Sequence, residues 1–294
     1  MRRVAWLWPV VVAALLIAGA PWPQAGNDFR FAIIGDRTGS AAPGVYERVL
    51  SDVDRFHPDF AINVGDTIEG GNDASAEREW SQTWAILKPH RFPFYFTPGN
   101  HDVWSTVSQR LWERETGRPL SYSFDCQNAH FTVLDNSRSW DLSDEQMAFL
   151  SRDLELNQKR DPKFIFFHQP FWLLPLKLQS GQFPLHQLVT KYHVRYVISG
   201  HTHQFARMVR DGVVYLVVGS SGGHLRIPAG TDGFAAGWFY QYIAAQVKGA
   251  AVELRVHEIG EPFGKGRTFK AEEWGEHGLK LIPGNHEPAP ASKE

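Results

Sequence analysis

The sequence predicts an α/β fold, in which strands and helices alternate along most of the chain. From Phe29 onward, short runs of β-branched or aromatic residues alternate with longer amphipathic segments, which is the pattern of βα units. Five of the apolar runs end in a turn that carries a carboxylate, amide or imidazole side chain. After His203 the pattern changes to consecutive β segments, so we expect the chain to finish in mostly antiparallel strands.

Length and composition are those of an ordinary folded protein. The chain has 294 residues, of which 43% are hydrophobic and 21% charged, which provides a core and gives no reason to expect disorder. At about 150 residues per domain, this length predicts about two domains, but a single large α/β domain can also be this long. The net charge of -2 lacks the basic excess of a nucleic-acid binder, so duplex nucleic acid is not an expected partner. The single cysteine, Cys126, excludes an intramolecular disulfide and a multi-cysteine zinc cluster.

The N-terminal segment 1–28 predicts export. Arg2 and Arg3 precede an apolar stretch over residues 4–20 that ends in small residues, which is typical of a signal peptide. Because Pro21 follows the expected cleavage point, the segment also suits a membrane anchor at the short end of spanning length. Both alternatives place the rest of the chain outside the cytoplasm: periplasmic, extracellular or membrane-anchored. We expect membrane contact only through this segment, if it is not cleaved.

The remaining chain predicts one domain over 29–282 and a polar, proline-rich tail over 283–294. Helices are expected over 43–56, 74–87, 103–115, 143–159 and 184–192. The fourth helix has the clearest start, because Ser143 and Gln146 form the S-x-x-Q pattern of a capping box. Strands are expected over 31–34, 60–64, 94–96, 164–167 and 194–198, and later over 205–210, 213–219, 238–247 and 252–257.

Side chains of metal-ligand type follow the first five expected strands. They are Asp36, Asp66, Asn100 with His101 and Asp102, His168, and His201 with His203. In open α/β sheets, ligands bind beyond the carboxyl ends of strands that lie about 5 Å apart, so we expect these side chains to converge. One such turn alone is commonplace, but five in succession predict a metal cluster. Carboxylate, amide and imidazole donors without a thiolate favour Mn, Fe or Zn.

Taken in order, these motifs resemble those of the calcineurin-like metallophosphoesterase superfamily, including the fold related to purple acid phosphatases. The motifs are Asp36, Gly65-Asp66, Gly99-Asn100-His101-Asp102, His168 and Gly200-His201-Thr202-His203. The resemblance implies a four-layer α/β/β/α sandwich of two mixed sheets flanked by helices, with a metal site at the carboxyl ends of the strands. It further implies two metal ions, either both divalent or a mixed Fe(III)/divalent pair.

The resemblance also implies residue roles and an activity. Asp66 would bridge the metals, Asp36 and His203 would hold the first, and Asn100, His168 and His201 would hold the second. The implied activity is hydrolysis of a phosphate monoester or diester, with a small-molecule, lipid or nucleotide phosphoester as the substrate. His101 would donate a proton to the leaving oxygen while Asp102 orients its imidazole.

Arg37 lies beside Asp36 in the sequence, and two readings of it stay open. Its planar fork of donors suits a substrate phosphate, and we therefore name it as a candidate substrate-binding residue. A surface ion pair is the alternative.

One position departs from the family's pattern. The commonest first motif has His two residues after the first Asp, whereas this chain has Thr38. Purple acid phosphatases also lack that His but carry Tyr three residues after the second-motif Asp, where this chain has Glu69, a further candidate ligand. We therefore expect a more open or weaker first metal site. A non-catalytic exported module that binds phosphate ligands with a degraded first site is the alternative function, and a metallohydrolase of another bond class is a third.

Overall fold

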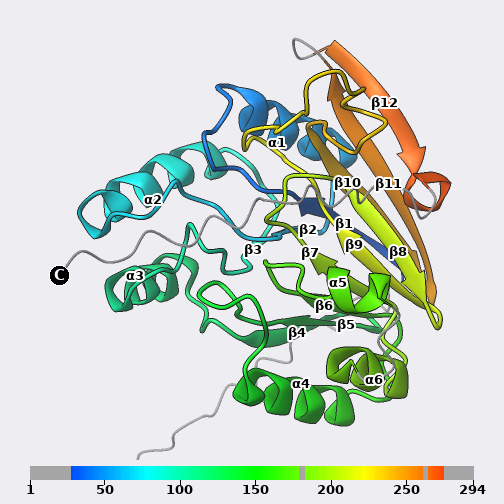
Figure 1. Ribbon diagram of the computed structural model, residues 1–294. Helices are drawn as coiled ribbons and strands as arrows, with labels where there is room; N and C mark the ends of the chain where they lie inside the picture. The colour runs from blue at the N-terminus through cyan, green and yellow to red at the C-terminus, as the bar shows by residue number, and fades with distance from the viewer. Residues whose placement is uncertain (1–27, 179–182, 261–263, 275–294) are drawn as a thin grey trace, which may run out of the picture.

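The computed structural model describes residues 28–178, 183–260 and 264–274 (Figure 1). Residues 1–27 of the expected export segment and the polar tail lie outside these ranges. Among the helices that the structure describes, none combines the length and apolar character needed to cross a membrane.

The first of two sheets is built from both halves of the chain. Its strand order is β12-β11-β10-β1-β2-β3. The strands are β1 (Asp28–Ile34), β2 (Phe60–Asn63), β3 (Phe94–Tyr95), β10 (Gln241–Lys248), β11 (Ala251–Gly260) and β12 (Gly264–Lys270). The strands β1, β2 and β3 run parallel, whereas β10, β11 and β12 pair antiparallel. The carboxyl ends of β1, β2 and β3 therefore face the same edge.

The second sheet has the order β4-β5-β6-β7-β9-β8. Its strands are β4 (Tyr122–Cys126), β5 (Ala129–Val133), β6 (Lys163–Phe166), β7 (Tyr196–Ser199), β8 (Ala206–Arg210) and β9 (Val213–Val217). The four central strands run parallel, and the edge strands β4 and β8 are antiparallel. The predicted architecture of two mixed sheets flanked by helices is confirmed.

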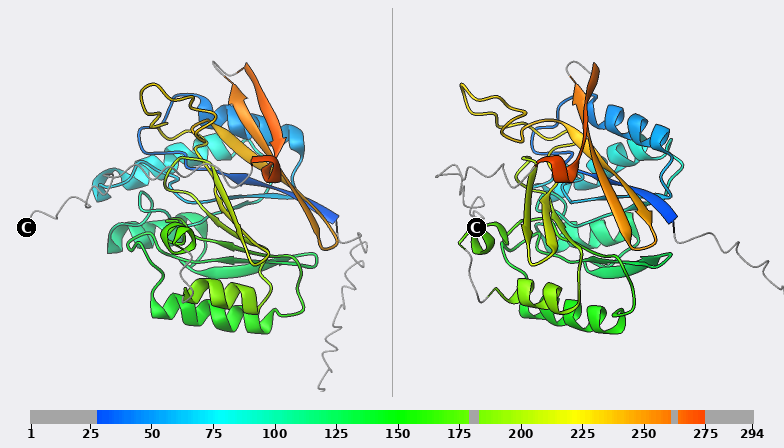
Figure 2. Two further views of the ribbon diagram at one scale, coloured as in Figure 1. Left: turned by 45° about the vertical axis from the view of Figure 1, so that its right-hand side comes forward. Right: turned by 90° about the vertical axis from the view of Figure 1, so that its right-hand side faces the viewer.

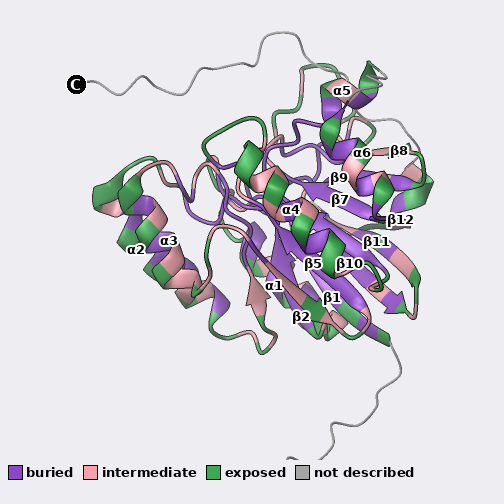
Figure 3. Cartoon of the chain, turned by 90° about the horizontal axis from the view of Figure 1, so that it is seen from below, coloured by how far each residue is buried: buried purple, intermediate pink, exposed green. Residues whose placement is uncertain are grey.

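Helices form the outer layers (Figure 2). They are α1 (Val45–Phe56), α2 (Asp73–Leu87), α3 (Thr106–Thr116), α4 (Asp144–Leu156), α5 (Leu173–Lys177) and α6 (Pro184–Lys191), followed by the short η1 (Ala271–Trp274). Leu150 and Leu154 of α4 and Val189 of α6 belong to one buried cluster with Ile165 of β6, so these helices cover the second sheet. Figure 3 shows the buried side of α4 turned toward the strands.

Aromatic rings join the two sheets in the centre of the molecule. Phe31 of β1 meets Phe164 of β6 and Phe131 of β5 edge to face, with ring centroids 5.3 Å apart in both pairs. Edge-to-face pairs add to the stability from burial, because the positive edge of one ring meets the negative face of the other. All three rings are fully buried, and the two sheets therefore share one core.

The capping prediction for α4 is half right. The Ser143 hydroxyl accepts the backbone N–H of Gln146 and caps the helix as expected. The side chain of Gln146, however, accepts hydrogen bonds from the Ser121 hydroxyl at 2.7 Å and the Asp135 N–H at 3.1 Å. The glutamine therefore fixes the loop before the helix instead of completing a capping box.

Candidate metal centre

The candidate ligands come from both sheets and meet where the strands end. Asp36, Asp66 and Asn100 follow β1, β2 and β3 of the first sheet. His168 follows β6, and the His201-Thr202-His203 segment follows β7 of the second sheet. The carboxyl ends of the parallel strands of the two sheets thus face one site.

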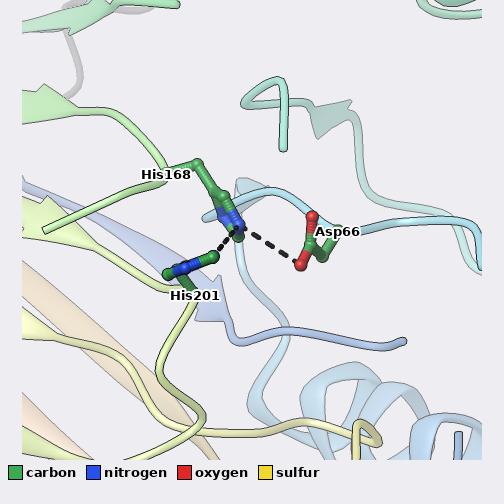
Figure 4. Close-up of side chains that lie close together, drawn as sticks. All are labelled: Asp66, His168 and His201. Carbon is green, nitrogen blue, oxygen red and sulfur yellow. Dashed lines mark hydrogen bonds and ion pairs between the residues drawn. The ribbon is translucent and has the colours of Figure 1, made fainter. Parts of the chain in front are cut away.

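One group of donors consists of Asp66, His168 and His201 (Figure 4). The Nε2 atom of His168 lies 3.2 Å from Oδ2 of Asp66 and 3.2 Å from Nδ1 of His201. Oδ1 of Asn100 lies 2.9 Å from each of these two ring nitrogens. Carboxylate, imidazole and amide donors therefore converge on one point.

A second group consists of Asp36, Asp66 and His203, all of them buried. Nε2 of His203 lies 3.9 Å from Oδ1 of Asp36. Oδ2 of Asp36 is buried and has no hydrogen-bond partner among the described residues. An unpaired buried carboxylate oxygen is costly, and a cation would satisfy it. The donors present therefore fit metal ions of the N- and O-preferring kind.

The ring orientation of two histidines is set by backbone carbonyls. Nδ1 of His168 contacts the carbonyl oxygen of Val64, and Nδ1 of His203 contacts that of His224, both at 2.8 Å. Because a carbonyl only accepts, each Nδ1 carries the proton and donates it. The Nε2 lone pair of each ring is then directed at the cluster, as in metal-ligating histidines.

The backbone at the site is strained. Asp66, His201 and His203 have φ values of 56°, 72° and 58°, in the left-handed region that side chains other than glycine seldom adopt. At Gly99, an added Cβ would lie only 2.2 Å from the backbone N and Oδ1 of Asp66. Glycine at this position therefore lets the loop after β3 approach Asp66 closely. Left-handed backbone at residues other than glycine is a form of strain that concentrates at functional sites.

Burial and mutual charge shift the pKa values of the cluster in opposite directions. Burial raises the pKa of Asp36 to about 6 and lowers that of His201 to about 3. Burial also disfavours charge on Asp66 and His168, but each favours the charged form of the other. The pKa of Asp66 is therefore held below its usual range, and that of His168 rises to about 9. A cation at this site takes the place of the proton on His168.

His101 lies beside the cluster and is anchored at two atoms. Its backbone N–H donates to Oδ1 of Asp66 at 3.0 Å, and its Nδ1 contacts the carbonyl oxygen of Glu69. Burial lowers the pKa of the imidazole, but the Asp66 charge, the Glu69 carbonyl and the Asp102 charge outweigh it, so the pKa is raised.

Among the described residues, the Asp102 carboxylate bonds to backbone groups and not to the imidazole that we expected it to orient. The Asp102 carboxylate accepts the backbone N–H groups of Thr67 at 2.7 Å, Ile68 at 3.2 Å and Gly99 at 3.0 Å. The orienting role that we expected for Asp102 therefore falls to the Glu69 carbonyl. Asp102 instead ties the loop after β2 to the loop after β3, and its burial raises its pKa to about 7.

Thr38 and Glu69 stand where the sequence departs from the family's pattern, and both side chains bond to backbone groups. The Thr38 hydroxyl donates to the carbonyl oxygen of Asp66 at 3.0 Å. The Glu69 carboxylate accepts the N–H groups of Gly39, Ser40 and Ala41 at 2.9–3.2 Å. Both side chains fix the loops around the donor group of Asp36, Asp66 and His203 and do not add a fourth donor to it.

Arg37, the candidate substrate-binding residue, already has protein partners. Its Nη1 donates to the carbonyl oxygen of Thr67 at 2.9 Å, and its guanidinium lies 5.5 Å from the ring centre of Tyr46. Within the described part of the chain, these contacts rather than a surface ion pair hold the side chain. The contact with a substrate phosphate stays a prediction.

Sequence analysis missed Asn136, which follows β5. Its Oδ1 accepts the backbone N–H groups of His168 and Gln169, each at 3.0 Å, and so fixes the turn that carries His168. The strand-end rule that found the other residues would have found Asn136 as well. It failed here because β5 itself was not predicted.

The family model for calcineurin-like phosphoesterases matches residues 29–205, more than half of the chain. The chain therefore belongs to the calcineurin-like phosphoesterase family. Its fold and the donor groups at the strand ends agree with that membership.

Individual relatives are distant. The chain is 24% identical over 171 residues to purple acid phosphatase 23 of Arabidopsis thaliana. This alignment covers 49% of this chain and 37% of the relative. The chain is 27% identical over 178 residues to a probable glycerophosphodiester phosphodiesterase, GpdQ, of Arcobacter nitrofigilis, which covers 55% of this chain and 63% of the relative. The chain thus spans less than two thirds of the length of these relatives.

Solved structures show the same fold. The purple acid phosphatase PPD1 of yellow lupin superposes with a TM-score of 0.61 at 16% identity, over 85% of this chain and 55% of that one. GAP50, described as the anchor in the inner membrane complex of Plasmodium, superposes with a TM-score of 0.60 at 15% identity, over 83% of this chain and 88% of that one. At these identities the likeness concerns the fold alone.

Proposed function

We propose that this chain hydrolyses phosphate esters with two metal ions. The observation that carries the proposal is the position of Asp66, which belongs to both donor groups. A carboxylate has two oxygens and can therefore bind two ions at once. Membership of the phosphoesterase family and relatives named as phosphatase and phosphodiesterase support the same reaction class.

Two sets of ligands follow from the donor groups. The first ion would be held by Asp36, Asp66 and His203, and the second by Asp66, Asn100, His168 and His201. The absence of thiolate from both sets favours Mn, Fe or Zn, as a divalent pair or as Fe(III) with a divalent ion. When bound, such a pair supplies a hydroxide nucleophile at neutral pH and stabilises charge on the phosphoryl oxygens.

In this proposal His101 is the general acid. Its Nδ1 is committed to the Glu69 carbonyl, so Nε2 is the nitrogen that can face a substrate. The raised pKa favours the protonated form of the ring. Nε2 donates that proton to the oxygen of the leaving group as the phosphorus–oxygen bond breaks. Asp66 positions the ring by accepting the backbone N–H of the same residue.

The substrate that we propose is a small-molecule, lipid or nucleotide phosphoester. We infer from the apolar segment 4–20 that the enzyme acts outside the cytoplasm. Fractionation of cells that express the full chain tests this part: recovery in the cytoplasm alone would contradict it.

The first experiment measures metal content per chain by elemental analysis of the purified full chain. The same preparation, loaded in turn with Mn, Fe and Zn, is assayed with generic aryl phosphate monoesters and diesters. We expect two ions per chain and turnover of at least one ester class. An Asp66→Asn variant serves as the control, and it should lose both ions.

One observation favours the second candidate, a non-catalytic phosphate-binding module. The side-chain oxygens of Thr38 and Glu69 bond to backbone groups. The first ion would therefore have three protein donors, Asp36, Asp66 and His203. One ion or none, binding of phosphate compounds and no turnover after reconstitution would support this module and overturn the enzyme.

A further inference from the structure

A tryptophan stands at the edge of the candidate metal centre. Trp140 lies in the loop between β5 and α4, and its ring centre is 5.8 Å from that of His201, tilted by 69°. The side chain is 43% exposed. The other exposed large hydrophobic side chains of the described residues are aliphatic. The indole is thus partly exposed to solvent beside a residue that we assign to the second ion.

The loop that carries Trp140 is held by buried amides. Nδ2 of Asn136 donates to the carbonyl oxygens of Trp140 at 3.3 Å and Gln169 at 2.8 Å. Nε2 of Gln169 donates to the carbonyl oxygens of Asn136, Ser137 and Ser139 at 2.8–3.3 Å. Asn136 and Gln169 are themselves buried. The indole is therefore presented by a fixed loop, because these bonds tie it to the strand end that carries His168.

We propose that Trp140 is a specificity residue that stacks on a planar aromatic group in the ester-leaving portion of the substrate. This inference rests on the proposed function, because the phosphoryl group must sit at the donor groups for its substituent to reach the indole. An exposed indole offers a large apolar face at low cost in side-chain entropy. Stacking of a planar base on an aromatic side chain favours binding by roughly five- to hundredfold.

The test must separate the effect of stacking on kcat/KM from the effect of a better leaving group. Benzyl phosphate and ethyl phosphate both release an alcohol, so they differ mainly in the ring. We therefore compare kcat/KM for this pair, and for the corresponding methyl diesters, using the metal-loaded full chain. The proposal predicts that the native chain prefers the benzyl ester by roughly five- to hundredfold. Trp140→Ala should bring the ratio close to one, and Trp140→Phe should keep most of it.

Leu156→Ala is the matched control, since Leu156 lies on α4 and is 85% exposed away from the donor groups. It should leave the ratio as in the native chain. An unchanged ratio in Trp140→Ala would overturn the proposal, and so would an equal loss with both esters, which indicates a structural role of the loop.

Binding supplies a second readout that does not need turnover. Benzylphosphonate and ethylphosphonate are titrated calorimetrically into the native chain, Trp140→Ala and Leu156→Ala. Tighter binding of the benzyl compound only where Trp140 is present supports the inference, even if no ester is hydrolysed and the proposed catalysis fails. Equal binding of the two phosphonates by the native chain overturns the inference while leaving any observed hydrolysis intact.

Discussion

At the scale of single residues, Asp66 carries several contacts at once. Its Oδ1 accepts the His101 N–H at 3.0 Å, its Oδ2 faces Nε2 of His168 at 3.2 Å, and its carbonyl oxygen accepts the Thr38 hydroxyl at 3.0 Å. It does so with φ at 56°. The strained backbone is what turns the carboxylate toward both donor groups while the main chain binds the neighbouring loop.

The role of His101 predicts a separation of metal binding from turnover. In His101→Ala, metal content should stay at the native value, because the residue is not among the donors of either group. Its kcat should fall by roughly 10²- to 10⁴-fold, as for loss of a general acid. Elemental analysis and steady-state kinetics with an alkyl phosphate measure both quantities. Native kcat on this poor leaving group would remove the proton-donor role.

The site leaves no room for a side chain at Gly99. In Gly99→Ala, the new methyl group would meet the N and Oδ1 atoms of Asp66 at 2.2 Å. We expect weaker metal binding and a loss of about 1–3 kcal/mol in the free energy of unfolding, as for other overpacked sites. Metal titration and urea unfolding test this.

Gly71→Ala is the control for that variant. Gly71 has φ of 75°, but an added Cβ meets nothing within 4 Å. The Gly71→Ala variant should therefore have a strained backbone at this position but bind metal with native affinity. Equal losses of metal affinity in both variants would show that contact with Asp66 is not the cause.

At the scale of elements, the sequence predicted those parts whose pattern is local. The helices α1, α2, α4 and α6 lie where amphipathic periodicity placed them, and α3 begins at Thr106 rather than 103, since Ser105 and Ser108 form its capping box. The hairpin of β4 and β5 was missed, because β4 is a half-exposed edge strand that includes Asp125 and lacks a continuous apolar run. A strand of that kind is recognisable only by its partner.

The hairpin carries a buried histidine that makes the stability depend on pH. Nδ1 of His130 contacts Asp125 at 2.7 Å and its Nε2 contacts Asp153 of α4 at 2.8 Å. Burial lowers the pKa of this imidazole, but the two carboxylates outweigh it and raise the pKa in the folded state. The stabilisation is thus complete below the ordinary histidine pKa and is lost as the pH rises through the folded pKa. The pKa of Asp153 is lowered despite its burial, so its contribution is lost only in acid.

His130→Gln should therefore destabilise the fold most near pH 6 and least at pH 9. The expected loss near pH 6 is about 1–3 kcal/mol, since two carboxylates lose a charged donor. Urea unfolding at each pH gives the difference from the native chain, which cancels the other titrating groups. Leu156→Ala, which removes an exposed side chain without a titratable group, is the control and should show a difference independent of pH. A loss in His130→Gln that grows with pH would contradict the sign.

At the scale of the whole molecule, the site depends on a relation between two sheets. The strand-end motifs predicted which side chains would converge, and the structure brings together all of those assigned as donors. The order of motifs along the chain could not show that His168 and His203 approach from a second sheet, because sheet pairing is a long-range property. For the same reason, the motifs could not show that the carbonyl oxygen of Glu69, and not Asp102, contacts the His101 ring.

Because both sheets contribute donors, metal binding should stabilise the fold as a whole. Asp36 and Asp66 follow strands of the first sheet, whereas His203 follows β7 of the second, so an unfolded chain has no comparable site. At a hundredfold excess of metal over its dissociation constant, linkage gives about 2.7 kcal/mol for each bound ion, or roughly 5–10 °C in Tm per ion for a domain of this size. Calorimetry with the metal and after chelation measures the shift. Asp66→Asn should lose it and Leu156→Ala should keep it; an equal shift in Asp66→Asn would mean that the stabilising metal binds elsewhere.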